Sequence, residues 1–458
     1  MNRKLTVPLL ASTFAAAIAG LFFLHVETAI SLDNLARDPG VRGGDPGAGG
    51  SIAGLTGTQT AAFTVGLDDF SSTEVAADGL GPRMNLDSCK GCHLQPAVGG
   101  TSPFVNPQVA FAHGGSDSVP AFIRENGPVR EARFVRNPDG TADGGVHALF
   151  TLTGRAGANG CNLAQPDFAR ELANRNVIFR IPTPVFGAGL IEQIPDGAIA
   201  ANQASDAPRK AFLGINGRPN FHVAGRTITG QTNNNGNDGT IARFGWKAQN
   251  KSLLLFAGEA YNVEMGITNE LFQTERDETA NCQFATVPND VTNTDANTLL
   301  EGISAIEKFA FFMRFAAPPA PSPDTPGGAT SIGRGSNLFA AVGCALCHTP
   351  ALTTGNSTVE ALRNQQVNLF SDLLVHDMGD GLADGVSQGQ AGPREFRSAP
   401  LWGLGQRIFF LHDGRTADLV EAIQAHRSNG SEANGVIRNF NNLRESQKQD
   451  LLNFLRSL

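Results

Sequence analysis

The chain has 458 residues, which is too long for a single compact core and favours two or three domains. Its composition is 41% hydrophobic and 17% charged, with 53 Gly and 25 Pro, which excludes a coiled coil, a collagen-like fibre and a wholly disordered chain. The formal net charge is −8 and there is no long basic run, so a nucleic-acid-binding protein is not expected.

The N-terminus has the pattern of an export signal. Arg3 and Lys4 precede an apolar stretch from Leu5 to Val26, and Ala17-Ile18-Ala19 offers a cleavage site of small residues. The apolar stretch continues past that site, and at about 20 residues it is long enough to span a bilayer as an uncleaved anchor. Residues 1–29 are therefore interpreted as an export signal or N-terminal anchor. The rest of the chain is expected in the periplasm, bound to the inner membrane only if this segment is retained.

Composition divides the remainder into four segments. Residues 30–62 form a Gly-rich lead that is expected to be flexible, and residues 63–317 form a first domain. That domain is predicted to end in one amphipathic helix over 299–315, where apolar residues recur at helical spacing. The Pro-rich run 318–328 predicts a stiff linker, and residues 329–458 form a second, smaller domain.

The second domain has two helix signals. Ser336 is expected to cap a helix that leads through Val342, and Ser446 is expected to open a closing helix with a capping box. Leu451, Leu452, Leu455 and Leu458 would form the buried face of that last helix. Strand signals elsewhere are short and scattered. The predicted fold is therefore mostly α, with long irregular loop insertions in the first domain, such as residues 230–239.

The cysteines carry the strongest chemical pattern. Four of the six fall in two C-x-x-C-H arrays, namely Cys89, Cys92 and His93, and Cys344, Cys347 and His348. This is the pattern of haem c attachment, because two thiols one helical turn apart can each form a thioether while the adjacent histidine reaches the iron. Two covalently bound haem c groups are predicted, with both histidines as proximal ligands. The remaining Cys161 and Cys282 are expected to pair in a disulfide, by elimination and because the expected compartment is oxidising.

Further motifs occur in a fixed order along the chain. They are Arg180-Ile181-Pro182-Thr183-Pro184, Phe244-Gly245-Trp246-Lys247-Ala248, Val263-Glu264-Met265, and the C-terminal set Phe396–Leu401, Leu411–Arg415 and Glu421–Ile423. With the haem arrays, they make the chain resemble the bacterial dihaem cytochrome c peroxidase superfamily and, within it, the dihaem oxidoreductase family. The resemblance covers most of residues 80–458, although Ile181 stands where the family has Asn.

The resemblance implies a division of roles between two cytochrome c-like domains. Glu264 would be the acid/base above a reactive first haem, and Trp246 would pass electrons to it from the second haem. A calcium ion between the domains is also implied by the family.

The motifs leave open which residue binds each iron on the side opposite its proximal histidine. For the second haem the resemblance indicates His426, and two histidine ligands would lower its potential relative to a His/Met pair. Met378, next to His376, is the alternative. For the first haem, His113 or His147 is a candidate, and an iron with an open face is the third option.

The aromatic composition is unusual, with 30 Phe, two Trp and one Tyr. Trp246, Tyr261 and Trp402 all fall in segments that resemble haem-adjacent motifs. One hypothesis is that Phe replaces Tyr elsewhere to prevent stray electron transfer to an oxidised haem, and the alternative is lineage composition.

The predicted function is that of an exported dihaem c-type oxidoreductase, similar to a peroxidase. A small donor protein of cytochrome c or cupredoxin type, or a quinol-linked donor, would supply electrons, and peroxide or a related small oxidant would accept them. Two other functions stay open at this point. One is a non-enzymatic dihaem electron carrier, and the other is peroxide-driven oxidation of a protein or an organic substrate.

Overall fold

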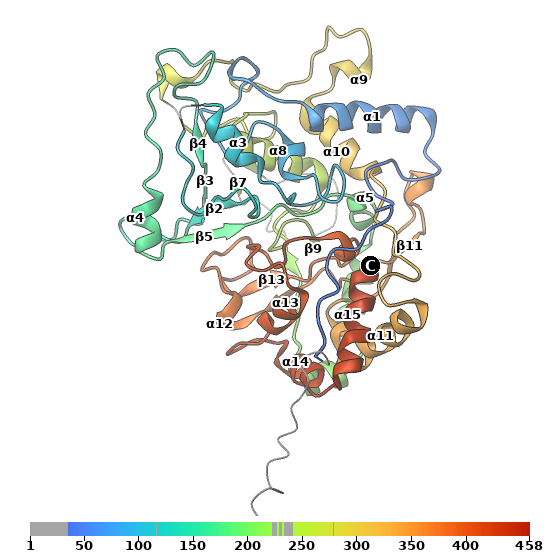
Figure 1. Cartoon of the computed structure of the whole chain (residues 1–458). Helices are drawn as coiled ribbons and strands as arrows, with labels where there is room; N and C mark the ends of the chain where they lie inside the picture. Colours follow the sequence, from blue (N-terminus) through green and yellow to red (C-terminus); the bar gives the residue numbers. More distant parts are fainter. Residues whose placement is uncertain (1–34, 116, 222–226, 229–230, 233–240, 278) are drawn as a thin grey trace, which may run out of the picture.

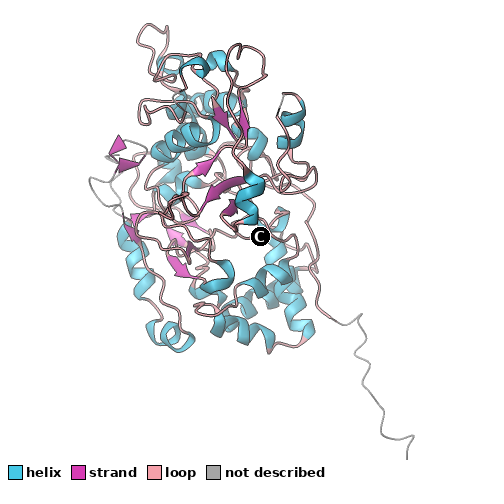
Figure 2. Ribbon diagram, turned by 90° about the vertical axis from the view of Figure 1, so that its left-hand side faces the viewer, coloured by secondary structure: helices cyan, strands magenta, loops and turns pink. Residues whose placement is uncertain are grey.

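The computed structural model describes residues 35–115, 117–221, 227–228, 231–232, 241–277 and 279–458. It is a mixed fold, 35% helical and 11% strand, so the expectation of a mostly α protein is too simple. The strands have two to four residues, and Figure 2 shows them scattered among loops between the helices. Such short strands leave almost no alternating pattern in the sequence. The division into two cytochrome c-like domains stays a prediction.

Three helices form the framework of the first half of the chain, at the top of Figure 1. They are α1 (Gly57–Ser71), α8 (Leu253–Met265) and α10 (Ala305–Phe315), and α10 packs against both of the others. Gly66 permits the close approach of α1, because a Cβ atom there would lie 2.2 Å from the carbonyl oxygen of Lys308. Phe70 and Phe312 fill the contact with rings 4.7 Å apart.

A small antiparallel sheet lies beside these helices. Its strand order is β3 (Val146–His147), β2 (Glu131–Phe134) and β5 (Val177–Arg180). The register places Glu131 opposite Arg180 and Phe134 opposite Val177. This pairing brings charged residues that are far apart in the sequence to one edge of the first half.

The second half is a cluster of helices at the bottom of Figure 1. Its main contact joins α11 (Ala329–Val342) to α15 (Glu445–Ser457), and α13 (Leu419–Ala425) and α14 (Asn434–Asn441) complete the cluster. The predicted buried leucines of α15 are all less than 9% exposed, which confirms that face.

The two predicted helix starts in this half are wrong by one to seven residues. Ser336 lies inside α11, which begins at Ala329 directly after two glycines. The last helix begins at Glu445 rather than Ser446, and the Gln447 side chain accepts the N–H of Arg444 at 3.1 Å. Several polar residues in each region can act as caps, so the pattern alone did not select one.

The helix expected over 299–315 is interrupted. It consists of α9 (Leu299–Gly302) and α10, with Ser304 and Glu307 forming a capping box at the start of α10. The Asp290 carboxylate also accepts the N–H groups of Ala305 and Ile306, at 2.7 and 3.1 Å. In a continuous helix these N–H groups would donate to carbonyls of the preceding turn. Here the Asp290 carboxylate accepts them instead.

The described part of the Gly-rich lead makes specific contacts from residue 36 onward. Residues 35–56, here called the strap, run along both halves of the molecule. Asp38 forms an ion pair with Arg456 of α15 at 2.6 Å, with side chains 7% and 1% exposed. Farther along, the N–H of Ile52 donates to the carbonyl of Phe315 at 2.7 Å. These contacts fix a segment whose composition alone suggests disorder.

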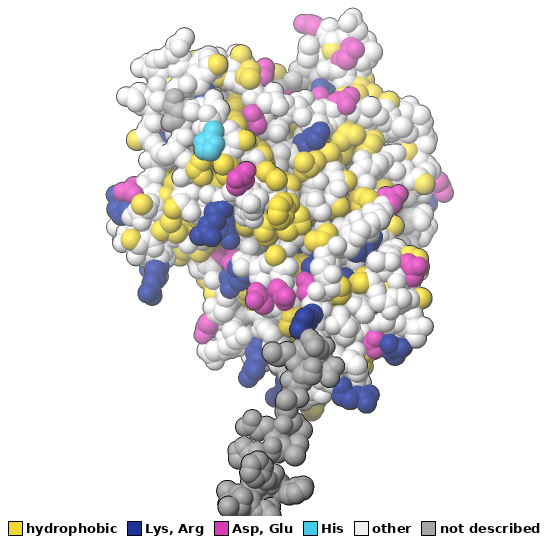
Figure 3. Space-filling view, viewed as in Figure 1, with side chains coloured by type: hydrophobic (Ala, Val, Ile, Leu, Met, Phe, Trp, Pro, Cys, Tyr) yellow, Lys and Arg dark blue, Asp and Glu magenta, His cyan; other side chains and the backbone are white. Residues whose placement is uncertain are grey.

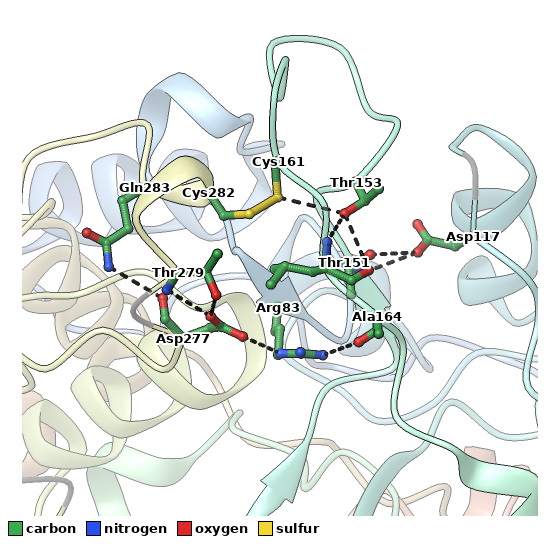
Figure 4. The surroundings of a disulfide bond; sticks show 11 residues. Arg83, Asp117, Thr151, Thr153, Cys161, Ala164, Asp277, Thr279, Cys282 and Gln283 are labelled. Atoms are coloured by element: carbon green, nitrogen blue, oxygen red, sulfur yellow. Dashed lines mark hydrogen bonds and ion pairs between the residues drawn. A yellow bond between two sulfur atoms is a disulfide. The ribbon is translucent and has the colours of Figure 1, made fainter.

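Cys161 and Cys282 form a disulfide with an S–S distance of 2.11 Å, across 121 residues of sequence. Figure 4 shows the bond beside the ion pair of Arg83 and Asp277, at 2.8 Å, so both tie the loop after α8 to the first half. The predicted signal (1–29) and most of the insertion 230–239 lie outside the described residues. Within the described residues, no helix is both long and apolar enough for a membrane crossing. The role of residues 318–328 as a domain linker stays a prediction.

Replacing Asp38 with Ala should lower the free energy of unfolding by about 3–5 kcal/mol, because it leaves the Arg456 guanidinium buried without its carboxylate. Urea denaturation followed by circular dichroism measures this difference. The matched control is Arg334→Met. Arg334 pairs with Asp450, which lies on α15 as Arg456 does, but the Arg334 side chain is 57% exposed. That substitution should cost less than about 1 kcal/mol. Equal losses for the two variants would contradict a structural role for the strap.

Candidate functional site

The first C-x-x-C-H array opens into a large cavity. Cys89 and Cys92 are the two ends of the short helix α2 (Cys89–Cys92), and His93 follows directly. The cavity encloses about 1170 Å³ of space, counted out to its opening to solvent. The polar side chains on its walls include Asn85, Gln108, Glu131, Arg133, Gln249, Glu259 and Glu264. We call it the first cavity.

The second array lines a separate cavity of about 1290 Å³, here called the second cavity. Cys344 begins a short 3₁₀ helix (Cys344–Leu346), and Cys347 and His348 follow it. Apolar side chains from α11, α13, α14 and α15 close this cavity, among them Phe339, Ile423, Val436 and Leu455. His426, at the end of α13, faces the same space.

Three histidines have the ring arrangement that an iron ligand needs. Each donates its Nδ1 hydrogen to a main-chain carbonyl: His93 to Gly100 at 2.9 Å, His348 to Phe370 at 3.1 Å, and His426 to Ala422 at 2.8 Å. Because a carbonyl oxygen only accepts, the proton must sit on Nδ1, and the Nε2 lone pair is left for a metal. Burial lowers the pKa of His93 and His348 to about 4, so both rings are neutral near pH 7.

His376 and Met378 also line the second cavity. Both ring nitrogens of His376 are taken, with Nδ1 2.9 Å from the Glu432 carboxylate and Nε2 3.0 Å from that of Asp372. This ring is therefore held between two carboxylates and presents no lone pair. The choice between His426 and Met378 as the sixth ligand stays a prediction, but His426 has the tautomer that ligation requires.

The structure brings neither expected histidine to the first cavity. His113 ends α3 (Pro107–His113) with an exposed side chain. His147 in β3 contacts the Asp143 carboxylate through Nε2 at 2.9 Å and stacks on Phe134, with ring centres 3.7 Å apart. In this structure the first cavity is lined instead by acidic and amide side chains, with Glu264 among them.

Glu264 on α8 shares a hydrogen bond with a second buried glutamate, Glu131 of β2. Asn85 Nδ2 donates to Glu264 at 2.8 Å, and Arg133 Nε donates to Glu131 at 2.7 Å. Burial, and then the charge of Glu131, raise the pKa of Glu264 well above its ordinary 4.5. Burial also opposes ionisation of Glu131, but the Arg133 charge and the hydrogen bond from Glu264 outweigh it and lower its pKa to about 2. The pair therefore holds one proton at neutral pH, on Glu264.

Trp246 contributes to the walls of both cavities, and its Nε1 donates to the carbonyl of Ile181 at 2.8 Å. Beside it lies a buried group of three charges, here called the Asp384 triad. Lys247 Nζ is 3.1 Å from one Asp384 oxygen and Arg180 Nη2 is 2.7 Å from the other, and none of these side chains is more than 3% exposed. The triad joins the two halves of the chain at the point where Trp246 separates the cavities.

Two buried arginines on the wall of the second cavity form no ion pair within the part of the chain that the structure describes, although Asp372 lies near enough to Arg397 to favour its charge. Arg397 and Arg407 are 8% and 7% exposed, and burial lowers the pKa of each to about 10. A buried cation without a counter-ion is costly, so these residues fit a ligand that brings carboxylates. Arg180 Nε is likewise buried at the first cavity without a hydrogen-bond partner among the described residues. Haem would bring an iron for the histidines to bind and two propionates for the buried arginines to contact. The residues present therefore fit this group.

Several of these residues were not found from the sequence, namely Glu131, Arg133, Glu259, Arg397 and Arg407. The spacing Glu131-x-Arg133 places both side chains on one face of a strand, but nothing in the sequence indicates which face is buried. The predicted calcium ion stays a prediction. Among the described residues, no group of three or more His, Cys, Asp or Glu could hold a metal ion.

Comparison with known proteins agrees with this chemistry. A family profile described as "Di-haem oxidoreductase, putative peroxidase" matches residues 143–458. Among solved structures, hydrazine synthase of Kuenenia stuttgartiensis, pressurised with 20 bar xenon, is 17% identical with a TM-score of 0.23. That match covers 35% of this chain and 56% of the other, and the likeness is too slight to support an argument. No curated protein sequence matches the chain.

Infrared difference spectroscopy should detect Glu264 as a neutral carboxylic acid at pH 7. The pKa of this group is raised, so its proton stays bound over the range where ordinary glutamates, near 4.5, have lost theirs. We expect a carboxylic acid carbonyl band that shifts in heavy water, and Glu264→Gln should remove the Glu264 component while leaving that of Glu74, whose pKa is about 7. The Glu131→Gln variant is the comparison, since Glu131 is ionised and contributes no such band itself. A spectrum without this band between pH 5 and 7 would contradict the assignment of the proton.

Proposed function

This chain belongs to the di-haem oxidoreductase family, and we therefore propose that it is a peroxidase-like enzyme with two covalently attached haem c groups that reduces peroxide or a related small oxidant. One observation carries the proposal. His93, which directly follows a C-x-x-C pair and donates through Nδ1 to a main-chain carbonyl, lines the same cavity as Glu264, a carboxyl group whose pKa is raised well above its ordinary value.

The side chains around each cavity support attachment of haem. Cys89 and Cys92 would hold one group by thioether bonds, and Cys344 and Cys347 would hold the other. When bound, the haem groups supply iron that exchanges electrons with peroxide and with the donor. Arg407 would compensate a propionate at the second cavity, and its buried charge would gain the anion that it lacks within the described chain.

Proton transfer is assigned to the Glu264–Glu131 pair. Reduction of hydrogen peroxide to two waters takes up two electrons and two protons. The pair carries a proton on Glu264 and a negative charge on Glu131, so it can accept a proton from one peroxide oxygen and deliver one to the other. Asn85 orients the Glu264 carboxyl group throughout, because its amide donates to Oε2 at 2.8 Å.

Electrons are proposed to enter at the second cavity rather than at the first. They would arrive at the second cavity from a small cytochrome c or cupredoxin, or from a quinol-linked donor, and cross to the first cavity through Trp246. Trp246 supports this route because it contributes to the walls of both cavities. A periplasmic location is proposed from residues 1–29, and the disulfide of Cys161 and Cys282 is typical of that compartment. The electron-carrier alternative requires a second side-chain ligand at the first iron, and neither His113 nor His147 lines that cavity.

Glu264→Gln should slow the reaction of the holoprotein with hydrogen peroxide by about 10²–10⁴-fold, because an amide cannot take up and return a proton. Rapid mixing followed by haem absorbance measures the rate. The control is Glu259→Gln, on the same helix and in the same cavity but bonded to Asn250. It should retain a rate close to that of the unmodified protein. An unchanged rate in Glu264→Gln, or an equal loss in the control, would remove Glu264 from this role.

His426→Met should raise the reduction potential of the second haem by on the order of 0.1 V, within the roughly 0.8 V that axial ligands span. A thioether stabilises ferric iron less than an imidazole does. Spectroelectrochemical titration measures the potential, and Met378→Leu, at the other candidate ligand, should leave it unchanged. The reverse result, with a shift only in Met378→Leu, would assign the sixth position to Met378.

A further inference from the structure

Tyr261 is the single tyrosine in a chain that contains 30 Phe. It lies on α8, three residues before Glu264, and lines the first cavity with its side chain 5% exposed. Its ring meets that of Phe309 edge-on at 5.0 Å. The phenyl rings on this wall are those of Phe70, Phe256 and Phe309, which lack a hydroxyl group. A phenol at this place therefore adds a chemical group that its neighbours do not have.

Among the described residues the phenol has one hydrogen-bond partner, and that partner is an acid. Tyr261 Oη donates to Glu74 Oε1 at 3.2 Å. Glu74 does not line the first cavity and is only half-buried, so it offers a proton arriving from the phenol a way toward solvent. A buried tyrosine that needs only packing would be served equally by phenylalanine, and a neutral acceptor would satisfy its hydroxyl group.

The surroundings of Glu74 set its charge near neutrality. Burial, and to a lesser extent the nearby carboxylates of Asp78, Asp69 and Asp290, raise its pKa to about 7, against the hydrogen bond from Tyr261, which lowers it. Asp69 is itself paired with Lys308, at 3.0 Å. Glu74 is thus about half ionised at neutral pH, and it can accept or release a proton there.

We propose that Tyr261 and Glu74 form a redox-active pair that stores one oxidising equivalent beside the first cavity. The inference rests on the proposed function, because hydrogen peroxide is the oxidant that withdraws two electrons from the first centre. Tyr261 returns one of these electrons, its O–H bond breaks, and the proton forms a new O–H bond on the Glu74 carboxylate. The product is a neutral tyrosyl radical. One electron from the donor, with the proton from Glu74, restores the phenol.

This step gives the enzyme a place for an oxidising equivalent when the second centre is already oxidised. Peroxide reacts in two-electron steps, whereas the proposed donors deliver single electrons. A tyrosine whose proton has a prepared acceptor can hold the second equivalent until another electron arrives. It also gives a reason for the absence of a second tyrosine, since the radical would have no further phenol to oxidise.

The test uses electron paramagnetic resonance of the holoprotein, frozen within milliseconds of mixing with hydrogen peroxide. Since the chain has one tyrosine, protein grown with ring-deuterated tyrosine labels this site alone. We expect an organic radical whose spectrum narrows with the label and is absent in Tyr261→Phe. The labelled, unmodified protein decides the question even if that variant does not fold.

The pH dependence identifies Glu74. Below a pKa of about 7 the carboxylate is protonated and cannot accept the phenolic proton, so the radical yield should fall about tenfold from pH 8 to pH 6. Glu74→Gln should lower the yield at pH 8 to the same extent and remove the pH dependence, while peroxide is still consumed. Trp246→Phe is the control for a tryptophan radical and should leave the label-sensitive signal in place.

The outcomes separate this inference from the proposed function. Rapid consumption of peroxide with no radical, or with a radical that ignores the label, overturns the inference and leaves the peroxidase intact. A protein that does not react with peroxide overturns both. A label-sensitive radical that persists unchanged in Glu74→Gln overturns the role of Glu74 as proton acceptor.

Discussion

The Asp384 triad is the constraint on which the arrangement of the two cavities depends. A lone buried carboxylate or ammonium would be very costly, so Arg180, Lys247 and Asp384 must stay together once they are excluded from water. Arg180 immediately precedes Ile181, and Lys247 immediately follows Trp246. The two arms of the triad therefore fix the hydrogen bond between Trp246 and Ile181, and with it the wall that the two cavities share.

The need to pair buried polar and charged groups also determines how each cavity is built. Main-chain carbonyls fix the tautomer of His93 and His348, an arginine fixes the ionised member of a glutamate pair, and two other arginines form no ion pair among the described residues. Protein groups thus satisfy part of the buried polarity and leave the rest to be satisfied by the ligand. Such incomplete compensation is uncommon in a core and is typical of a binding site.

The sequence was sufficient for features carried by local spacing. The two C-x-x-C-H arrays and the buried face of the last helix follow from residues close together along the chain, whereas Glu264 and Trp246 were implied by the resemblance to a known family. Glu131 could not be found in this way, because its place depends on the pairing of β2 with β5, across about fifty residues. His113 and His147 were expected from distance along the chain, and folding carries both away from the first cavity. The strap was missed because its order comes from partners near the other end of the chain, which its composition does not reveal.

The strap also bears on the order in which the molecule can be completed. Asp38 is among the first described residues to be synthesised, and Arg456, its partner, is among the last. Their ion pair cannot form until nearly every residue between them has been made, including both cysteine arrays. Docking of the strap on α15 is thus a late event in the life of each chain. A polypeptide that ends before α15 leaves the strap without this partner.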